Sequence, residues 1–302
     1  MPNDSRSPAL VVLAAGMGRR FGGSKQLSGV GPGGETLLEY SLFDARRAGF
    51  GHVTFVIRPD MQDEFRQFAE SRLPPALAWT IALQRLDDLP PPHQVPSGRS
   101  KPWGTAHALL AARASVTGAF AVVNADDYYG PEAFRALASC LGGDTTEWAL
   151  VGYRLRATLS SAGGVNRGVL EVSAGGRLLG IEEVLDIAAT EDDAVMGLGE
   201  AGPRLLHDDA LVSMNLWGFR PDIFPALAEG FERFLDHGDL LSDEYPLPVA
   251  VQDLLAVTGQ QVSVLTPGSR WFGMTYAEDL PFVRAELQRL TDAGSYPSRL
   301  WA

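Results

Sequence analysis

The chain has 302 residues, 45% of them hydrophobic and 21% charged, which is the composition of a globular protein with a sizeable core. Its formal net charge of −12 repels polyanions, which excludes nucleic acid and anionic membrane as expected partners. The single cysteine, Cys140, excludes an intramolecular disulfide framework and a cysteine-rich zinc site, and we interpret it as a buried structural thiol.

No stretch of the sequence approaches the roughly 20 apolar residues of a membrane span. The apolar run at residues 9–15 is short and poorly flanked for an export signal. A lone cysteine fits a reducing compartment, so the sequence predicts a cytoplasmic protein.

The first half alternates between short apolar, β-rich runs, which predict buried strands, and amphipathic stretches, which predict helices. The expected strands are residues 9–15, 52–57, 78–83, 119–124 and 148–151. The expected helices are residues 36–48, 60–72, 104–114 and 131–141. Such alternation predicts an α/β fold with a mostly parallel sheet covered by helices on both faces.

The pattern changes after about residue 150. The later elements are strands at 169–172, 178–181, 211–217 and 261–265, with helices at 221–235, 245–257 and 276–290. Two segments are expected to lack regular structure. Residues 190–203 are acidic and aperiodic, which indicates a mobile loop, and the proline-rich residues 86–100 are expected to form a loop over a binding site.

A glycine-rich segment, residues 13–25, follows the first strand directly. Such a turn lets backbone N–H groups approach a phosphate, and the next helix adds its positive end. The dinucleotide fingerprint fails because the sixth position from Gly16 is Phe21, and the Walker loop fails because Lys25 follows Ser24 and is followed by Gln26. What remains is Leu-Ala-Ala-Gly-x-Gly-x-Arg followed by a lysine; the alternative is a turn with only a structural role.

At these residues the sequence resembles the sugar-1-phosphate nucleotidyltransferases, the NDP-sugar pyrophosphorylase family of uridylyl- and thymidylyltransferases. The resemblance implies a Rossmann-like three-layer α/β/α fold with a mixed, mostly parallel central sheet. It implies one domain over residues 1–302, with a nucleotide-binding half at 8–150 and a sugar-binding and C-terminal half at 151–302. The implied triphosphate contacts are Ala14, Ala15, Gly16 and Gly18, with Arg20 and Lys25 as catalytic residues.

Two carboxylates, Asp126 and Asp127, end the apolar strand that precedes Gly130. Ligands of open α/β sheets bind at the carboxyl ends of strands, and a carboxylate there suits Mg²⁺. The family places its metal-binding aspartate at such a position, so the resemblance assigns Mg²⁺ to Asp126. The alternative is a helix-capping turn before Pro131, and Asp127 is also compatible with capping while Asp126 binds metal.

The segment at residues 100–108 resembles the part of the family that opens a helix beside the base. Gly104 would then touch the nucleobase and Thr105 would cap the helix. Lys101 lies in the same segment and is, with Lys25, one of only two lysines in a chain that otherwise uses arginine.

Gln84 resembles the residue that recognises a pyrimidine edge; alternatively it is an exposed glutamine at a strand end. His107 is interpreted as a packed helix residue rather than a catalyst.

The second half resembles the family more loosely. Residues 166–169 resemble the turn whose backbone meets the sugar, with Gly168 as the contact, and Glu183 resembles the glutamate that holds sugar hydroxyls. Asn215 would border the sugar pocket from a later strand; alternatively that strand simply alternates with one buried face.

One position departs from the family pattern. A second metal-binding aspartate near the C-terminus aligns with Gly273, in the segment that starts at Trp271. Either another carboxylate, such as Asp243 or Glu244, supplies the ligand, or the metal sits differently.

These features predict a nucleotidyltransferase that joins a sugar 1-phosphate to a nucleoside triphosphate, with UTP or dTTP favoured and Mg²⁺ as cofactor. Two alternatives stay open: a transferase that uses CTP or a non-sugar phosphate acceptor, and a catalytically weak regulatory protein that binds nucleotide sugars. The sequence leaves the sugar, the base and the oligomeric state undetermined.

Overall fold

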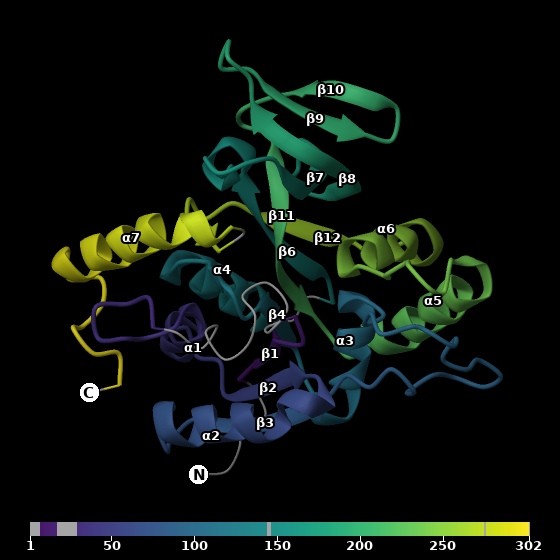
Figure 1. Cartoon of the computed structure of the whole chain (residues 1–302), viewed down its shortest axis with the longest axis horizontal. Helices are drawn as coiled ribbons and strands as arrows, with labels where there is room; N and C mark the ends of the chain where they lie inside the picture. Colours follow the sequence, from purple (N-terminus) through teal and green to yellow (C-terminus); the bar gives the residue numbers. More distant parts are fainter. Residues whose placement is uncertain (1–6, 17–28, 144–145, 275, 302) are drawn as a thin grey trace.

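The computed structural model describes residues 7–16, 29–143, 146–274 and 276–301, and its elements surround one large sheet (Figure 1). Four strands of the first half run parallel, in the spatial order β4-β1-β2-β3. They are β1 (Ala9–Leu13), β2 (His52–Ile57), β3 (Ala78–Leu83) and β4 (Phe120–Asn124). Because parallel strands end on the same edge, Leu13 and Asn124 are neighbours there.

The sheet is completed by strands of the second half. β11 (Leu211–Phe219) runs antiparallel to β4 and to β6 (Trp148–Arg154), and β12 (Val262–Leu265) pairs parallel to β6. The predicted mixed, mostly parallel sheet is confirmed.

Helices cover both faces of this sheet, as its continuous apolar strands require. On β1, Leu10 and Val12 pack with the helices of one face, and Val11 and Leu13 pack with those of the other. The first face carries α1 (Leu37–Arg47), α2 (Gln62–Arg72) and α4 (Pro131–Leu141). The second face carries α3 (Thr105–Ala111), α5 (Ile223–His237) and α6 (Leu247–Thr258), which confirms the three-layer α/β/α arrangement (Figure 1).

A small third core joins the C-terminal segment to the first half of the chain. It holds residues of α7 (Leu280–Asp292) together with Tyr40 of α1 and Tyr128. Tyr128 belongs to β5 (Asp127–Tyr128), which pairs antiparallel with β13 (Phe272–Gly273), and its ring stacks on Phe272 at 4.3 Å.

An antiparallel arm projects from the sheet beyond β11 (Figure 1). It consists of β7 (Val165–Val172), β8 (Leu178–Ala189), β9 (Val195–Gly199) and β10 (Gly202–Leu206). Its inner face buries Val184 and Val195, whereas Leu198 and Leu205 are exposed on the arm.

The arm corrects two expectations. Residues 190–203 are not a loop, because half of them form β9 and the start of β10, a hairpin of two short, glycine-containing strands without clear alternation. Residues 166–169 are not a turn but lie within β7, paired with β8 and β11. Residues 86–100 do lack helix and strand, as predicted. No helix in the described part of the chain is long and apolar enough to cross a bilayer.

Candidate active site

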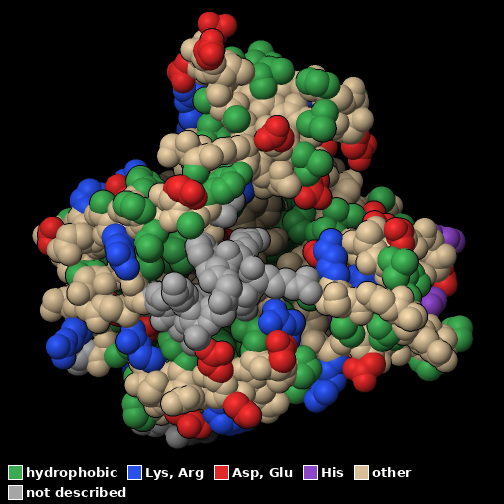
Figure 2. All heavy atoms as spheres, viewed as in Figure 1, with side chains coloured by type: hydrophobic (Ala, Val, Ile, Leu, Met, Phe, Trp, Pro, Cys, Tyr) green, Lys and Arg blue, Asp and Glu red, His purple; other side chains and the backbone are tan. Residues whose placement is uncertain are grey.

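A cavity of about 800 Å³ opens at the carboxyl ends of β1 and β4, and the surface is hollowed there below the arm of β7–β10 (Figure 2). One wall comes from β1, the end of β3 and the start of α3, and the opposite wall from β7, β8 and β11. Nine of the predicted contact residues line it: Ala15, Gly16, Gln84, Gly104, Thr105, Asp126, Gly168, Glu183 and Asn215. Three other predicted contacts of the glycine-rich segment, Gly18, Arg20 and Lys25, lie outside the described residues.

The end of β1 is held in place by its neighbours. Ala14 is fully buried in the core, and its N–H donates to Val56 O at 2.8 Å, so Ala14 does not line the cavity. The Ala15 carbonyl accepts from Arg58 Nη1 at 2.7 Å. The chain therefore enters the glycine-rich segment from a fixed position.

A buried hydrogen-bond relay fixes the Gln84 side chain. Its Nε2 donates to Gly104 O at 3.0 Å and to His107 Nδ1 at 3.2 Å, while His107 Nε2 lies 3.1 Å from Asp88 O. Burial lowers the pKa of His107, which favours the neutral ring that this relay requires. His107 is thus a packed helix residue, as expected, and Gln84 is buried rather than exposed, with its amide oxygen left for a ligand donor.

Gly104 is required by both backbone and space. Its φ is +100°, and a Cβ there would lie 2.5 Å from Tyr245 O. Thr105 was expected to cap α3, but this prediction is wrong, because Gly104 occupies the N-cap. The Thr105 hydroxyl instead accepts a hydrogen bond from Leu247 N, at the start of α6, at 2.7 Å. Lys101 does not line the cavity, since its Nζ lies 3.1 Å from Glu244 Oε1 and 3.0 Å from Ser242 O.

Asp126 and Asp127 both line the cavity, just beyond β4. Asp127 is buried, and its Oδ2 accepts from Asn124 Nδ2 at 2.9 Å and from the Tyr129 hydroxyl at 3.2 Å. Burial and the charge of Asp126 raise the pKa of Asp127 above its ordinary value. Asp127 does not cap α4, whose N-cap is Gly130 with no side-chain hydrogen bond.

Gly273 lies directly opposite Asp127 in the β5–β13 pair. A Cβ built on Gly273 would lie 2.4 Å from Asp127 Oδ1 and 2.9 Å from the Trp271 ring. Of the two alternative carboxylates, Glu244 lines the cavity but pairs with Lys101, and Asp243 does not line it. Asp243 accepts instead from Asp239 N at 2.9 Å.

The opposite wall carries the predicted acceptor contacts. Gly168 of β7 pairs with Glu183 of β8 and with Ser213 of β11, so these residues lie side by side. Asn215 interrupts β11 at an irregularity, with φ of +60°, and its Oδ1 accepts from Trp217 Nε1 at 3.2 Å. A non-glycine residue in the left-handed region at a cavity wall is typical of a functional site.

The lining also contains residues that were not predicted, among them Arg167, Trp271 and Tyr276. The buried Arg167 donates to Thr158 O at 2.6 Å and to Asn166 O at 2.9 Å, and its guanidinium lies 5.1 Å from the Trp271 ring centre. The sequence gave no clear signal for Arg167, because its strand also contains Asn166 and Glu171 and residues 166–169 were interpreted as a turn.

The described lining is acidic, with one arginine, Arg167, against four carboxylates: Asp126, Asp127, Glu183 and Glu244. The described residues contain no cluster of three or more His, Cys, Asp or Glu side chains arranged to hold a metal ion. Two adjacent carboxylates nevertheless suit Mg²⁺, which takes one or two carboxylates and completes its shell with water and phosphate oxygens.

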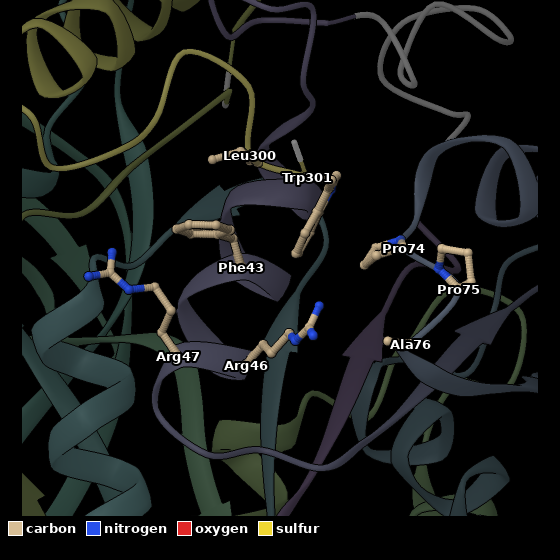
Figure 3. A pocket seen from close by; sticks show the side chains of 8 residues that line it. All are labelled: Phe43, Arg46, Arg47, Pro74, Pro75, Ala76, Leu300 and Trp301. Atoms are coloured by element: carbon tan, nitrogen blue, oxygen red, sulfur yellow. The ribbon is translucent and has the colours of Figure 1, made fainter. Parts of the chain in front are cut away.

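A second hollow, of about 640 Å³, lies between the end of α1 and residues 74–76 (Figure 3). The rings of Phe43 and Trp301 pack at 5.5 Å beside it, and Arg46 and Arg47 line it without any carboxylate. Because it is formed by helix and loop residues rather than by strand ends, the larger cavity is the candidate active site.

Comparison with known proteins agrees with this geometry. The model of the MobA-like NTP transferase domain family matches residues 10–160. No curated protein sequence matches the chain. The fold and the cavity at its strand ends define an NTP-dependent transferase, and the chain belongs to the MobA-like NTP transferase domain family. The predicted enzyme class is confirmed.

Solved structures show the same fold over nearly the whole chain. An inositol-1-phosphate CTP transferase from T. maritima superposes with a TM-score of 0.64 at 14% identity, over 95% of this chain and 97% of that one. A UDP-glucose pyrophosphorylase complexed with UDP-glucose superposes with a TM-score of 0.58 at 14% identity, over 94% of this chain and 99% of that one. HddC from Yersinia pseudotuberculosis, complexed with GMP-PN, superposes with a TM-score of 0.56 at 13% identity, over 92% of this chain and 99% of that one.

Proposed function

We propose that this enzyme transfers a nucleotidyl group from UTP or dTTP to a sugar 1-phosphate and releases pyrophosphate. The observation that carries the proposal is the single cavity that places Gln84 and Gly104 on one wall, Glu183 and Asn215 on the other, and Asp126 at β4. In the sheet, β4 lies between β1 and β11. The cavity volume of about 800 Å³ is within the usual range of small-ligand sites.

The reaction needs no general base. A phosphate oxygen of the acceptor, already ionised near neutral pH, attacks the α-phosphorus in line. The bond from the α-phosphorus to the bridging oxygen breaks, and pyrophosphate leaves with the electron pair. Positioning and charge neutralisation then supply the catalysis. The neutral, doubly engaged His107 is consistent with this, because it holds Gln84 instead of moving a proton.

The glycine-rich segment is the proposed phosphate site. Its backbone and Arg20 would bind the β- and γ-phosphates, and Lys25 would stabilise charge at the α-phosphate. Asp126 would hold Mg²⁺, which supplies charge neutralisation at the phosphates. The acidic described lining supports this division, because Arg167 is the one cation that it offers.

The orientation of the Gln84 side chain supports the proposal that the base is uracil or thymine. Its amide N–H groups are directed to Gly104 O and His107 Nδ1, so the side chain presents its oxygen to a ligand. An acceptor oxygen suits the N3–H of uracil and thymine, whereas cytosine N3 is itself an acceptor.

The acceptor wall supports a polyhydroxylated phosphate. Glu183, Ser213 and Asn215 offer carboxylate, hydroxyl and amide groups that bind hydroxyls. A cyclitol phosphate also presents several hydroxyls and a phosphate, and one of the solved structures with this fold is the inositol-1-phosphate CTP transferase from T. maritima. CTP with a non-sugar phosphate is therefore the second candidate, and a catalytically weak regulatory protein that binds nucleotide sugars is the third.

A pyrophosphate-release panel tests the proposal. The four ribonucleoside triphosphates and dTTP are each combined with sugar 1-phosphates and inositol 1-phosphate, with Mg²⁺ present. We expect release to require both substrates and to be fastest with UTP or dTTP. Fastest release with CTP would favour the second candidate. Tight nucleotide binding without release would contradict the transferase and favour a binding protein.

A further inference from the structure

We propose that Asp127 supplies the second metal-binding carboxylate of this enzyme, from the strand opposite the position that Gly273 occupies. The inference rests on the proposed function, in which Asp126 holds Mg²⁺. It concerns where the second oxygen donor comes from in a chain whose aligned position carries no side chain.

The two positions share one place in space. Asp127 and Gly273 are direct partners in an antiparallel pair, and side chains of such partners project from the same face. A Cβ on Gly273 would lie 2.4 Å from Asp127 Oδ1, far inside van der Waals contact. The carboxylate of Asp127 therefore fills the space that a side chain at 273 would enter.

Glycine is needed at 273 for space and not for backbone conformation. Gly273 is not among the described residues with positive φ, so its backbone suits any amino acid. The atoms that exclude a side chain are Asp127 Oδ1 and the ring of Trp271. The absence of a side chain at 273 is thus coupled to the presence of a carboxylate at 127.

The hydrogen bonds of Asp127 orient its two oxygens differently. Asn124 Nδ2 and the Tyr129 hydroxyl both engage Oδ2, and Ser41 Oγ holds the Asp127 backbone carbonyl at 3.1 Å. Oδ1 is the oxygen that faces Gly273. Fixing one oxygen and directing the other is how an outer shell orients a ligating carboxylate.

The competing carboxylates are engaged elsewhere. Glu244 pairs with Lys101, and Asp243 accepts from the backbone of its own loop. Asp127 alone is adjacent in sequence to Asp126, lines the same cavity and contacts the position of the missing aspartate.

A double-mutant cycle on metal affinity tests the inference. Wild type, Asp127→Asn, Gly273→Ala and the double variant are titrated with Mn²⁺ beside a non-hydrolysable UTP analogue, and bound Mn²⁺ is measured by electron paramagnetic resonance. We expect Asp127→Asn to weaken Mn²⁺ binding on the order of tenfold or more. Gly273→Ala should weaken it too, by displacing Oδ1, but should add nothing in the Asp127→Asn background.

Two control variants calibrate the cycle. Asp292→Asn makes the same carboxylate-to-amide change on the exposed side of α7 and should leave Mn²⁺ affinity unchanged. Asp126→Asn reports on the proposed function itself. If Asp126→Asn weakens Mn²⁺ binding but Asp127→Asn stays within about twofold of wild type, the inference is overturned while the proposed metal site stands. If neither variant weakens it, the proposed metal site fails as well.

Wild-type protein gives an independent measurement if a variant does not fold. Crystals grown with the UTP analogue and Mn²⁺ should show anomalous density about 2.2 Å from oxygens of both Asp126 and Asp127. Density bound to Asp126 but beyond hydrogen-bond distance from Asp127 Oδ1 would overturn the inference.

Discussion

The two walls of the cavity are built in different ways. The wall at β1 and α3 is made largely of backbone and fixed relays, with Gly104 at φ +100° and Gln84 locked by His107. The wall at β7, β8 and β11 presents side chains from antiparallel strands, among them Glu183, Asn215 and Arg167. Backbone groups suit what all nucleoside triphosphates share, whereas side chains can change without altering the fold. We therefore expect the first wall to set the reaction and the second to set the acceptor.

The largest effect is expected at the residues proposed to bind the metal and the α-phosphate. Asp126→Ala and Lys25→Ala should each lower kcat by about 10²–10³-fold or more. In the proposed mechanism the first loses the ligand of the Mg²⁺ that neutralises the phosphates, and the second loses a cation at the α-phosphate. Pyrophosphate release measures the loss, and circular dichroism checks the fold. Near-normal turnover in both variants would contradict the proposed chemistry.

A change in the backbone wall should damage both stability and nucleotide binding. Gly104→Ala forces a strained φ and a Cβ 2.5 Å from Tyr245 O, which should cost about 2–4 kcal/mol of unfolding free energy and raise KM for the triphosphate. Chemical denaturation and steady-state kinetics measure the two effects. Gly118→Ala is the matched control, since no atom lies within 4 Å of its Cβ. Equal stability of the two variants would show that Gly104 is not constrained.

A change in the side-chain wall should affect the acceptor alone. Asn215→Gly keeps the left-handed backbone at φ +60° and removes the amide, so KM for the acceptor should rise about tenfold while KM for the triphosphate is unchanged. Asn215→Ala should show the same kinetic effect and lose about 1 kcal/mol more stability, because alanine resists that conformation. If KM for the triphosphate rises as well, the two walls are not separable.

The smallest effect on turnover is expected at Asp44 of α1, which does not line the cavity. Its Oδ2 accepts from the Tyr296 hydroxyl at 2.6 Å, and that hydroxyl lies 2.7 Å from the Tyr128 hydroxyl beside Asp127. Burial raises the pKa of Asp44 from 3.8 to about 7. Because the folded state binds the proton of Asp44 more tightly than the unfolded state, protonation of Asp44 stabilises the fold. This contribution to the free energy of unfolding is fully present below about pH 4 and is lost as the pH rises through 7.

Asp44→Asn mimics the protonated carboxyl and should remove this pH dependence. Its melting temperature should exceed that of wild type by a few degrees at pH 8, and the gap should close toward pH 4. Thermal unfolding across that range measures the gap. A constant difference between the two proteins would mean that Asp44 does not titrate within it.

The sequence predicted the parallel part of the fold well because strand, turn and helix each leave a local signal there. The apolar runs before Gly16 and Asp126 identify both strand ends, and these ends are neighbours in the sheet. It failed on β9 and β10, a local hairpin of two five-residue strands that contain glycine and show no clear alternation. It also missed the contact of Thr105 with Leu247 and the pairing of Asp127 with Gly273, because those partners are distant in the chain. It missed Arg167 because residues 166–169 were interpreted as a turn.

The pairing of Asp127 with Gly273 bears on how such enzymes diverge. If one carboxylate can be donated from either member of a cross-strand pair, its owner can change without moving the ion. An ancestor with aspartate at both positions would be crowded, and one with neither would lack the ligand, so an exchange requires nearly simultaneous substitutions. Comparisons that score each position alone then mistake a relocated ligand for a lost one. Scoring the 127–273 pair jointly would separate inactive descendants from rearranged ones.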